Sequence, residues 1–394
     1  MNSDTLETPR DSSLPLGLTL AGFVTFVLMG LLQAMFGPAL FSIRSSFNLD
    51  LGTANVLVSA FFTGNVVMIL ANGALEQVLS KTNSLLIAAS CLTLGSLGLS
   101  LAPSWGLLLA CALLTGLGYG GSVLNFNTLF ASGFGSRGTA MVSLLNAAWS
   151  VGAILGPILM GNFLENFRVP FLLIAIVASL MIPLAFTARQ LESAKPSLEV
   201  QSNSAGSKSF DSSQISWPWL LGFAVMFLLY VGAEVGAGAN ESRHLHDAFG
   251  VPLKDAAFLS SLFWFGGLVA RVLVAPISLR VPASSLVLIC LIGMSLSLAL
   301  AHVPVLASFA YAACGLFTGP IFPSALSWLT SQTRASLSMT SWILASANFG
   351  GVIFPPIIAG LTAENAVIIP TVLLVLTAAN AVLAFSLGRL NPRV

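Results

Sequence analysis

The chain has 394 residues, of which 56% are hydrophobic and only 7% are charged. A soluble domain carries roughly 25% charged residues, so this composition excludes a water-soluble protein and makes lipid the solvent for most of the chain. The net charge is +1 and no basic block is present, which argues against nucleic acid as a partner. The four cysteines lie inside apolar runs without metal-ligand spacing, and we expect neither a metal nor a cofactor.

Apolar segments long enough to cross a bilayer follow one another along the chain. A transmembrane helix needs about 20 apolar residues, and hydropathy predicts six such segments in each half. The first half holds Leu16–Phe41, Gly52–Leu79, Ser84–Ala102, Trp105–Ala131, Gly138–Leu164 and Val169–Ala188. The second half holds Trp217–Asn240, Asp255–Leu279, Ser284–Ala301, Val303–Thr330, Ala335–Leu361 and Ala366–Leu387. We therefore expect an all-α membrane protein of twelve transmembrane helices, although short turns near Pro103 and His302 leave ten or eleven open.

The basic residues predict that both termini face the cytoplasm, since Lys and Arg concentrate in cytoplasmic loops. One side of the predicted spans carries Arg10, Lys81, Arg137, Arg189, Lys195, Lys208, Arg280, Arg334, Arg389 and Arg393. The other side carries only Arg44, Arg168, Arg243 and Lys254. The predicted organisation is a cytoplasmic tail (1–15), a six-helix bundle (16–189), a flexible Ser-rich linker (190–216), a second bundle (217–388) and a second cytoplasmic tail (389–394).

The two halves repeat a pattern at a constant offset of 199 residues. Gly152, Pro157, Gly161, Glu165 and Asn166 recur as Gly351, Pro356, Gly360, Glu364 and Asn365, and Gly116 and Gly120 recur as Gly315 and Gly319. Two similar bundles leave a cavity between them and can rock about it. Small residues permit close helix packing and prolines permit bends, so we expect gating or structural roles for Gly152, Pro157, Gly351 and Pro356.

Several motifs carry a family resemblance over almost the whole chain. They are Gly37-Pro38, Gly116-Leu-Gly-Tyr-Gly with Asn127, Gly152-Ala-Ile-Leu-Gly-Pro157 and Tyr230-Val-Gly-Ala-Glu234-Val-Gly. The sequence resembles the major facilitator superfamily, and more narrowly its fucose/galactose/glucose symporter branch, which includes sodium-dependent glucose transporter-like proteins. It departs from the usual loop signature after the second span at Gln77 and Val78, and the span-four acid of sugar symporters is replaced by Val123.

The resemblance implies a fold of two pseudo-symmetric six-helix bundles in the plasma (inner) membrane. It also implies a monomer that moves a small polar solute, with a sugar as the expected solute and H⁺ or Na⁺ as the coupling ion. Two alternatives stay open: proton-coupled efflux of amphipathic compounds, and a transporter-like solute sensor. No P-loop, HExxH motif or Ser/His/Asp arrangement is present, and we expect no enzyme activity.

Glu234 is the acid that lies clearly within a predicted span, whereas Glu241 falls near a span end and His244, His246 and His302 fall in outer loops. An ionised carboxylate in a membrane interior is costly, so Glu234 is the candidate for proton or cation coupling. Arg271 also lies within a span, where it could pair with a carboxylate or serve in gating.

Amide and aromatic side chains within the spans complete the candidate substrate site. With Glu234, these are Gln33, Asn65, Asn127, Asn146, Trp149, Tyr230, Trp264 and Asn348. Amides offer both donors and an acceptor to a polyhydroxylated solute, and an indole can stack on a sugar ring. Asn125 and Asn127 lie about 200° apart on a helix, so at most one of them faces the cavity.

Overall fold

The structure is a computed structural model that describes residues 14–187, 217–332 and 337–390. The predicted linker 190–216 and most of the two predicted tails lie outside these residues.

The first half is a bundle of six long helices. They are α1 (Leu16–Phe47), α2 (Leu51–Val78), α3 (Lys81–Leu101), α4 (Trp105–Gly133), α5 (Gly138–Gly161, after the short 3-10 turn η1, Gly135–Arg137) and α6 (Arg168–Ala185). Local chemistry fixes several ends. The Asp50 side chain accepts a hydrogen bond from the Thr53 amide at 2.9 Å and begins α2, and Asn48 ends α1 in the left-handed region at φ 50°.

The second half is a bundle with six spans, two of which are broken. Its helices are α8 (Trp217–Arg243, followed by the π-helical turn η3, His244–Ala248), α9 (Leu253–Leu259), α10 (Ser261–Ser278), α11 (Ala283–Leu300), α12 (Ala307–Thr318), α13 (Ile321–Gln332), α14 (Leu337–Leu361) and α15 (Ile369–Arg389, after the 3-10 turn η4, Ala366–Ile368). The pair α9–α10 forms one span and α12–α13 another. Pro320 separates α12 from α13 because proline has no amide hydrogen for the helical ladder.

The twelve predicted spans are confirmed. Within the described residues, eleven helical segments are long and apolar enough to cross a membrane, and α14 adds the twelfth with its apolar stretch Ala345–Leu361. The boundaries differ most at two ends. Helix α1 continues past Phe41 to Phe47, and α8 continues past Asn240 to Arg243, so that Arg44 and Arg243 lie in last turns rather than in loops.

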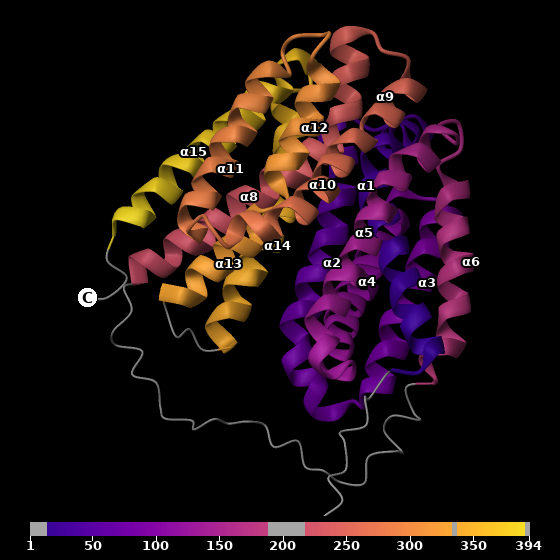
Figure 1. Cartoon of the computed structure of the whole chain (residues 1–394). Helices are drawn as coiled ribbons and strands as arrows, with labels where there is room; N and C mark the ends of the chain where they lie inside the picture. The colour runs from indigo at the N-terminus through magenta and orange to yellow at the C-terminus, as the bar shows by residue number, and fades with distance from the viewer. Residues whose placement is uncertain (1–13, 188–216, 333–336, 391–394) are drawn as a thin grey trace, which may run out of the picture.

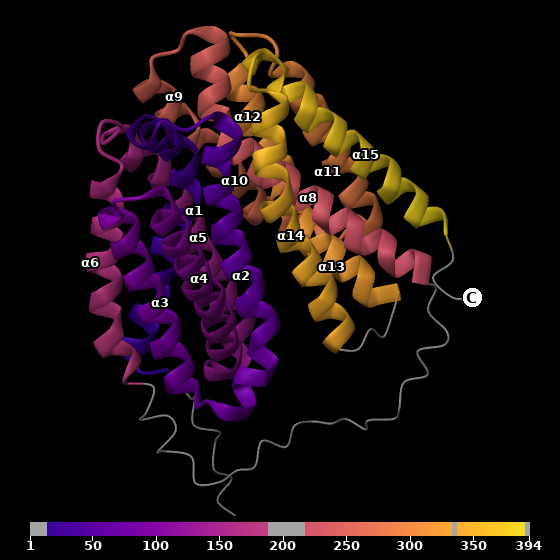
Figure 2. The same cartoon turned by 180° about the vertical axis from the view of Figure 1, so that it is seen from behind.

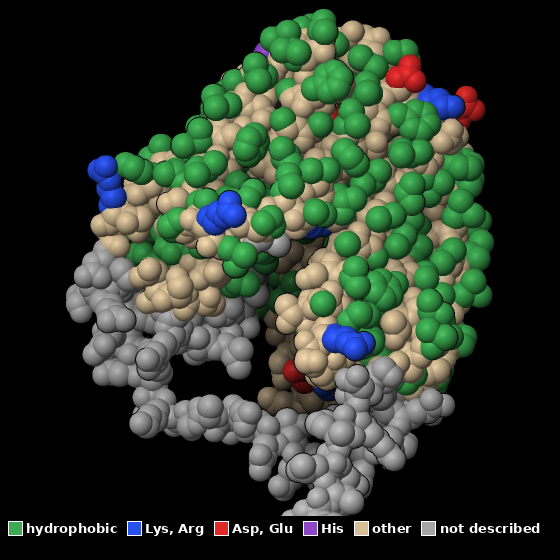
Figure 3. Space-filling view, viewed as in Figure 1, with side chains coloured by type: hydrophobic (Ala, Val, Ile, Leu, Met, Phe, Trp, Pro, Cys, Tyr) green, Lys and Arg blue, Asp and Glu red, His purple; other side chains and the backbone are tan. Residues whose placement is uncertain are grey.

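The flanks of the molecule are apolar. Leu94, Leu180, Leu296 and Val375 are each more than half exposed, and hydrophobic side chains cover the sides of both halves while charged side chains lie toward the ends (Figure 3). A monomeric soluble protein rarely exposes an apolar surface of this extent. The chain is therefore a multi-pass membrane protein.

The two bundles touch at one end and diverge at the other (Figures 1 and 2). They diverge toward the face where α1 and α8 begin and where α6 and α15 end, which we call the terminal face. Figure 3 shows the hollow between the halves on this side. At the other face, which we call the opposite face, α8, α9 and α10 of the second half lie against the first half (Figure 1).

Glycines place equivalent helices of the two halves at equivalent contacts. A Cβ on Gly116 of α4 would collide with the Phe61 carbonyl of α2, and a Cβ on Gly315 of α12 would collide with the Phe263 carbonyl of α10. The repeat at offset 199 thus has the same packing role in both bundles. The match between Gly152 and Gly351 is only partial, because the α14 glycine that approaches the α8 backbone, as Gly152 approaches α1, is Gly350.

Candidate functional site

Polar contacts join the two halves midway through the membrane. Asn65 of α2 donates from Nδ2 to Oδ1 of Asn348 in α14 at 2.9 Å, and the Ser59 hydroxyl donates to the Val352 carbonyl at 2.6 Å. Gly351 lies directly against the Phe62 ring, because a Cβ there would come within 2.6 Å of it. These contacts form one wall that closes the space between the halves.

A second set of contacts closes the space toward the opposite face. The Gly238 carbonyl approaches Gly37 of α1 so closely that a Cβ there would lie 2.5 Å from it. The Phe41 and His246 rings meet edge to face with centroids 5.7 Å apart. These contacts, which we call the opposite-face gate, explain why Gly37 is glycine: any side chain would separate α1 from α8.

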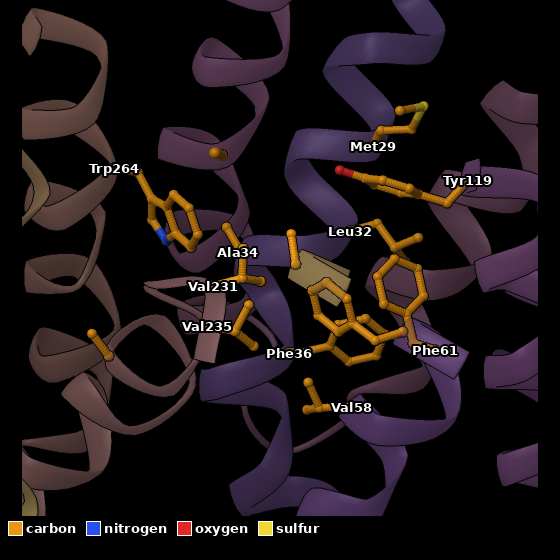
Figure 4. Packing of buried hydrophobic residues seen from close by; sticks show 14 of the residues in the cluster. Met29, Leu32, Ala34, Phe36, Val58, Phe61, Tyr119, Val231, Val235 and Trp264 are labelled. Carbon is orange, nitrogen blue, oxygen red and sulfur yellow. The ribbon is translucent and has the colours of Figure 1, made fainter. Parts of the chain in front are cut away.

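A chain of hydrogen bonds lies in the middle of the first half. The Trp149 indole donates to the Tyr119 hydroxyl at 2.9 Å, and that hydroxyl donates to Oε1 of Gln33 at 2.8 Å. Each residue lies near the middle of its helix, so the chain lies at mid-membrane depth. In Figure 4, Tyr119 and Trp264 lie on opposite sides of α1.

The second half adds a cation and an indole to this chain. The Arg271 guanidinium lies over the Trp149 ring, 4.9 Å from its centroid, and donates to the Ser150 hydroxyl across the two halves. The Trp264 ring meets the Trp149 ring edge to face, with centroids 5.7 Å apart. Gln33 and Trp264 also line a small void between the halves, together with Phe36, Val58, Phe62 and Val235. Predicted site residues from both halves thus meet at one place.

Glu234 lies on α8 one turn beyond Tyr230, and both side chains face this region. Its carboxylate lies close enough to Arg271 and Tyr230 to interact electrostatically with both. The Tyr230 hydroxyl donates to the Thr318 carbonyl at 3.3 Å. Among the described residues, Glu234 and Arg271 form no ion pair within 4 Å, so the carboxylate keeps capacity for a proton or a solute.

The amides of the first half have different surroundings. Asn125 is buried and donates to the Ser84 hydroxyl of α3 at 2.9 Å, so it serves packing within the bundle. Asn127 is half-buried, and its Nδ2 donates to the Val123 carbonyl of its own helix while Oδ1 has no partner. Asn146 is exposed and lies one turn from Trp149 and Ser150 on the same face of α5, on the side of the terminal face.

Three features were not anticipated from the sequence. Tyr119 links Gln33 to Trp149, and its place inside the Gly116-Leu-Gly-Tyr-Gly motif was the available signal. Glu241 lies in the last turn of α8, near a span end as expected, but its side chain is fully buried and neither carboxylate oxygen has a hydrogen-bond partner. His244 was expected in a loop but is fully buried in η3. Continuation of α8 beyond Asn240, with the π-helical turn that follows it, explains why both residues lie in helical structure.

The site offers hydrogen-bond donors, hydrogen-bond acceptors and aromatic faces to a small solute. One acid, Glu234, and one cation, Arg271, lie beside these groups. No group of three or more His, Cys, Asp or Glu residues that could hold a metal occurs in the part of the chain that the structure describes. Pro157 in α5 and Pro355–Pro356 in α14 lie on the side of the opposite face, where the halves meet.

Comparisons with known proteins agree with this architecture. The chain is similar to a mutant of the nucleoside transporter NupG (14% identity, TM-score 0.73, 94% of this chain and 99% of that chain covered). It is similar to a D-xylose-proton symporter (14% identity, TM-score 0.74, 95% of this chain and 98% of that chain covered). It is also similar to a mutant of the peptide transporter POT in complex with alafosfalin (16% identity, TM-score 0.75, 95% of this chain and 95% of that chain covered). The comparison with curated protein sequences returns no match.

Residues 22–245 match the family described as the Major Facilitator Superfamily, and this match covers more than half of the chain. The structural neighbours share the fold across nearly their whole lengths. With twelve apolar spans in two bundles around a mid-membrane polar site, the chain is a transporter and not an enzyme, and it belongs to the Major Facilitator Superfamily.

Proposed function

We propose that the protein moves a small, hydroxylated organic solute, a sugar or a sugar-containing compound, by alternating access coupled to a proton gradient or a sodium gradient. The observation that carries the proposal is the convergence of Gln33, Tyr119 and Trp149 with Trp264 and Arg271 at mid-membrane. Repeat-built transporters place substrates at this depth between their halves. Hydroxyl groups suit directional amide and phenol partners, and sugar rings suit flat indole faces.

The structural neighbours support this class of solute. A nucleoside transporter and a D-xylose-proton symporter are among them, and nucleosides and xylose both carry several hydroxyl groups. Asn65 and Asn348 hold each other in the present conformation. We infer that they exchange this bond for solute contacts when the halves separate, and that Asn127 and Asn146 line the route from the terminal face.

We further propose that the terminal face is cytoplasmic and that the protein lies in the plasma (inner) membrane as a monomer. The distribution of Lys and Arg supports this orientation. A cysteine at Ser136, between α4 and α5, should resist an impermeant reagent added to intact cells, whereas a cysteine at Asn166, between α5 and α6, should react. Both positions are exposed. The reverse labelling pattern would overturn the orientation.

Proton-coupled efflux of amphipathic compounds is the second candidate. The observation that favours it is the void between the halves, where Phe36, Val58, Phe62 and Val235 outnumber the polar lining residues. Apolar solutes would bind there by burying surface rather than by hydrogen bonds.

One experiment separates the two candidates. Purified protein is screened by thermal shift against sugars, nucleosides, amino acids, organic acids and amphipathic cations. Hits are then tested by counterflow in proteoliposomes. Stabilisation and counterflow by sugars or nucleosides support the proposal, whereas stabilisation confined to amphipathic compounds supports efflux. A ligand that stabilises the protein without any counterflow would identify a sensor.

A further inference from the structure

Glu241 is a second membrane acid, distinct from the central site. It lies on α8 seven residues beyond Glu234, which places it on nearly the same helix face about 10 Å closer to the opposite face. Its side chain is fully buried, and both of its oxygens lack a hydrogen-bond partner. An ionised carboxylate in such a place is strongly disfavoured, since it has lost water without gaining a donor or a counterion.

The neighbouring cation does not neutralise this acid. The guanidinium of Arg243 donates to the Thr362 hydroxyl at 2.8 Å and to the Thr362 carbonyl at 2.6 Å, and it forms an ion pair with Asp247 at 3.2 Å. Three of its donor groups are thereby directed away from Glu241.

Other titratable groups also leave Glu241 unpaired. Tyr311 and Cys314 of α12 lie within electrostatic range of Glu241, but the Tyr311 hydroxyl contacts Nδ1 of His244 at 3.2 Å. Arg44 of α1 and His302 before α12 act on Arg243 and His244 respectively. Helix α14 has no ionisable residue among its described positions. Helix α15 carries Arg389, which lies at the terminal face, far from Glu241.

The opposite-face gate brackets Glu241 along α8. The Gly238 carbonyl meets Gly37 just before it, and His246 meets Phe41 just after it. The helix changes to π geometry at His244, directly beyond the acid, and π segments frequently mark functional sites. Opening this gate would separate α1 from both flanks of Glu241.

We propose that Glu241 is a proton-binding site that must be protonated before the opposite-face gate closes. The carboxylate takes a proton from a hydronium ion, which becomes water, and no other bond changes. A sodium ion would need a shell of several oxygen ligands. Among the described residues, neither carboxyl oxygen of Glu241 has a hydrogen-bond partner, so we assign the ligand as a proton. This inference rests on the proposed ion-coupled transport and adds a site to it.

The test measures the gate itself, without any solute. Spin labels at Asn162→Cys and Asp255→Cys, both exposed beside the contact of Gly161 with Ala257, report the distance between the halves at the opposite face. The half-buried Cys91 and Cys111 are replaced by alanine, and the label pair is measured in nanodiscs between pH 5 and pH 9.

We expect acidification to favour the short distance, with the ratio of closed to open protein changing by up to about tenfold per pH unit for one proton. Glu241→Gln, which is always neutral, should remain closed at every pH. Glu364→Gln, which changes an exposed acid on the same face, should respond as the unmodified protein does. An unmodified protein that shows no pH response, or a Glu241→Gln protein that responds normally, overturns the proposal.

A conservative variant protects the test against a folding failure. If Glu241→Gln cannot be purified, Glu241→Asp should keep the pH response with a shifted midpoint, because a shorter acid occupies a different position. An unchanged midpoint overturns the proposal. Failure of sugar or nucleoside binding would leave the gate response intact, and failure of the Glu241 site would leave solute binding intact, so the two proposals are tested separately.

Discussion

Asn65 and Asn348 are 283 positions apart in sequence, yet their side-chain amides join the two halves of the molecule by a hydrogen bond of 2.9 Å. The bond crosses from α2 to α14, the two helices with the most extensive contact between the bundles. The halves diverge toward the terminal face (Figure 1), and this bond holds α2 and α14 together across them.

Asn65→Ala should shift the molecule toward the state that is open at the opposite face. One hydrogen bond contributes about 0.5–1.5 kcal/mol net, which corresponds to roughly a 2- to 12-fold change in the ratio of the two states. The spin-label pair at positions 162 and 255 measures this ratio. Asn125→Ala is the control, since its bond to Ser84 lies within one half. An equal shift in both variants would contradict the role assigned to Asn65.

The repeated glycines should govern stability rather than transport. In Gly116→Ala and Gly315→Ala, the new methyl group meets a backbone carbonyl of α2 or α10, and the helices must separate. Overpacking of this kind costs about 1–3 kcal/mol, and we expect a lower melting temperature for the purified protein in detergent. Gly73→Ala is the matched control because no atom lies within 4 Å of its new Cβ. A Gly73→Ala melting temperature as low as the others would show that the assay does not report packing.

Hydropathy and the repeat were sufficient to predict the architecture. In lipid, the backbone hydrogen bonds must be made within apolar helices, so the lengths and number of apolar runs in the sequence predict the spans. The offset of 199 residues relates Gly116 to Gly315, and the structure places both at equivalent helix contacts. Helix ends were less predictable, because polar residues such as Arg44 and Arg243 continue a helix when a nearby carbonyl or carboxylate accepts their hydrogen bonds.

The connections between site residues could not be read from the sequence. Helical spacing places Tyr119 on α4 but does not show that its hydroxyl reaches Gln33 on α1. The same limit applies to Arg271, for which a carboxylate partner was an open alternative and which instead contacts Ser150 and Trp149 across the halves. Such contacts depend on how twelve helices pack in three dimensions. The periodicity within one helix does not predict this packing.

Glu234→Gln should separate coupling from binding. Glutamine keeps the shape of the side chain and its hydrogen-bonding capacity toward Tyr230, but it cannot carry a proton or a charge. We expect loss of accumulation against a gradient in proteoliposomes, while counterflow exchange of the same solute continues. Accumulation that persists in the variant would remove Glu234 from the coupling role. Accumulation that follows sodium rather than pH would assign the site to a cation.

Substitution of Tyr119 or Trp264 at the mid-membrane site should strongly reduce the affinity for the solute. Tyr119→Phe removes the hydroxyl between Gln33 and Trp149, so two partly buried polar groups lose their partner while the ring and its packing remain. Leaving a buried partner unpaired costs about 1–3 kcal/mol, and we expect solute affinity to fall by roughly 5- to 150-fold.

Trp264→Ala should produce a comparable loss because it removes the aromatic wall of the site. Both variants should still reach the membrane, since Tyr119→Phe keeps the ring that meets Phe61 of α2, and Trp264 meets Trp149 across the two halves rather than within one bundle. Trp217→Ala is the control, because that indole is 75% exposed at the start of α8. Affinities from isothermal titration of the purified variants with the best solute of the screen decide the matter: if Trp217→Ala weakens binding as much as Tyr119→Phe, these residues act on the fold and the solute binds elsewhere.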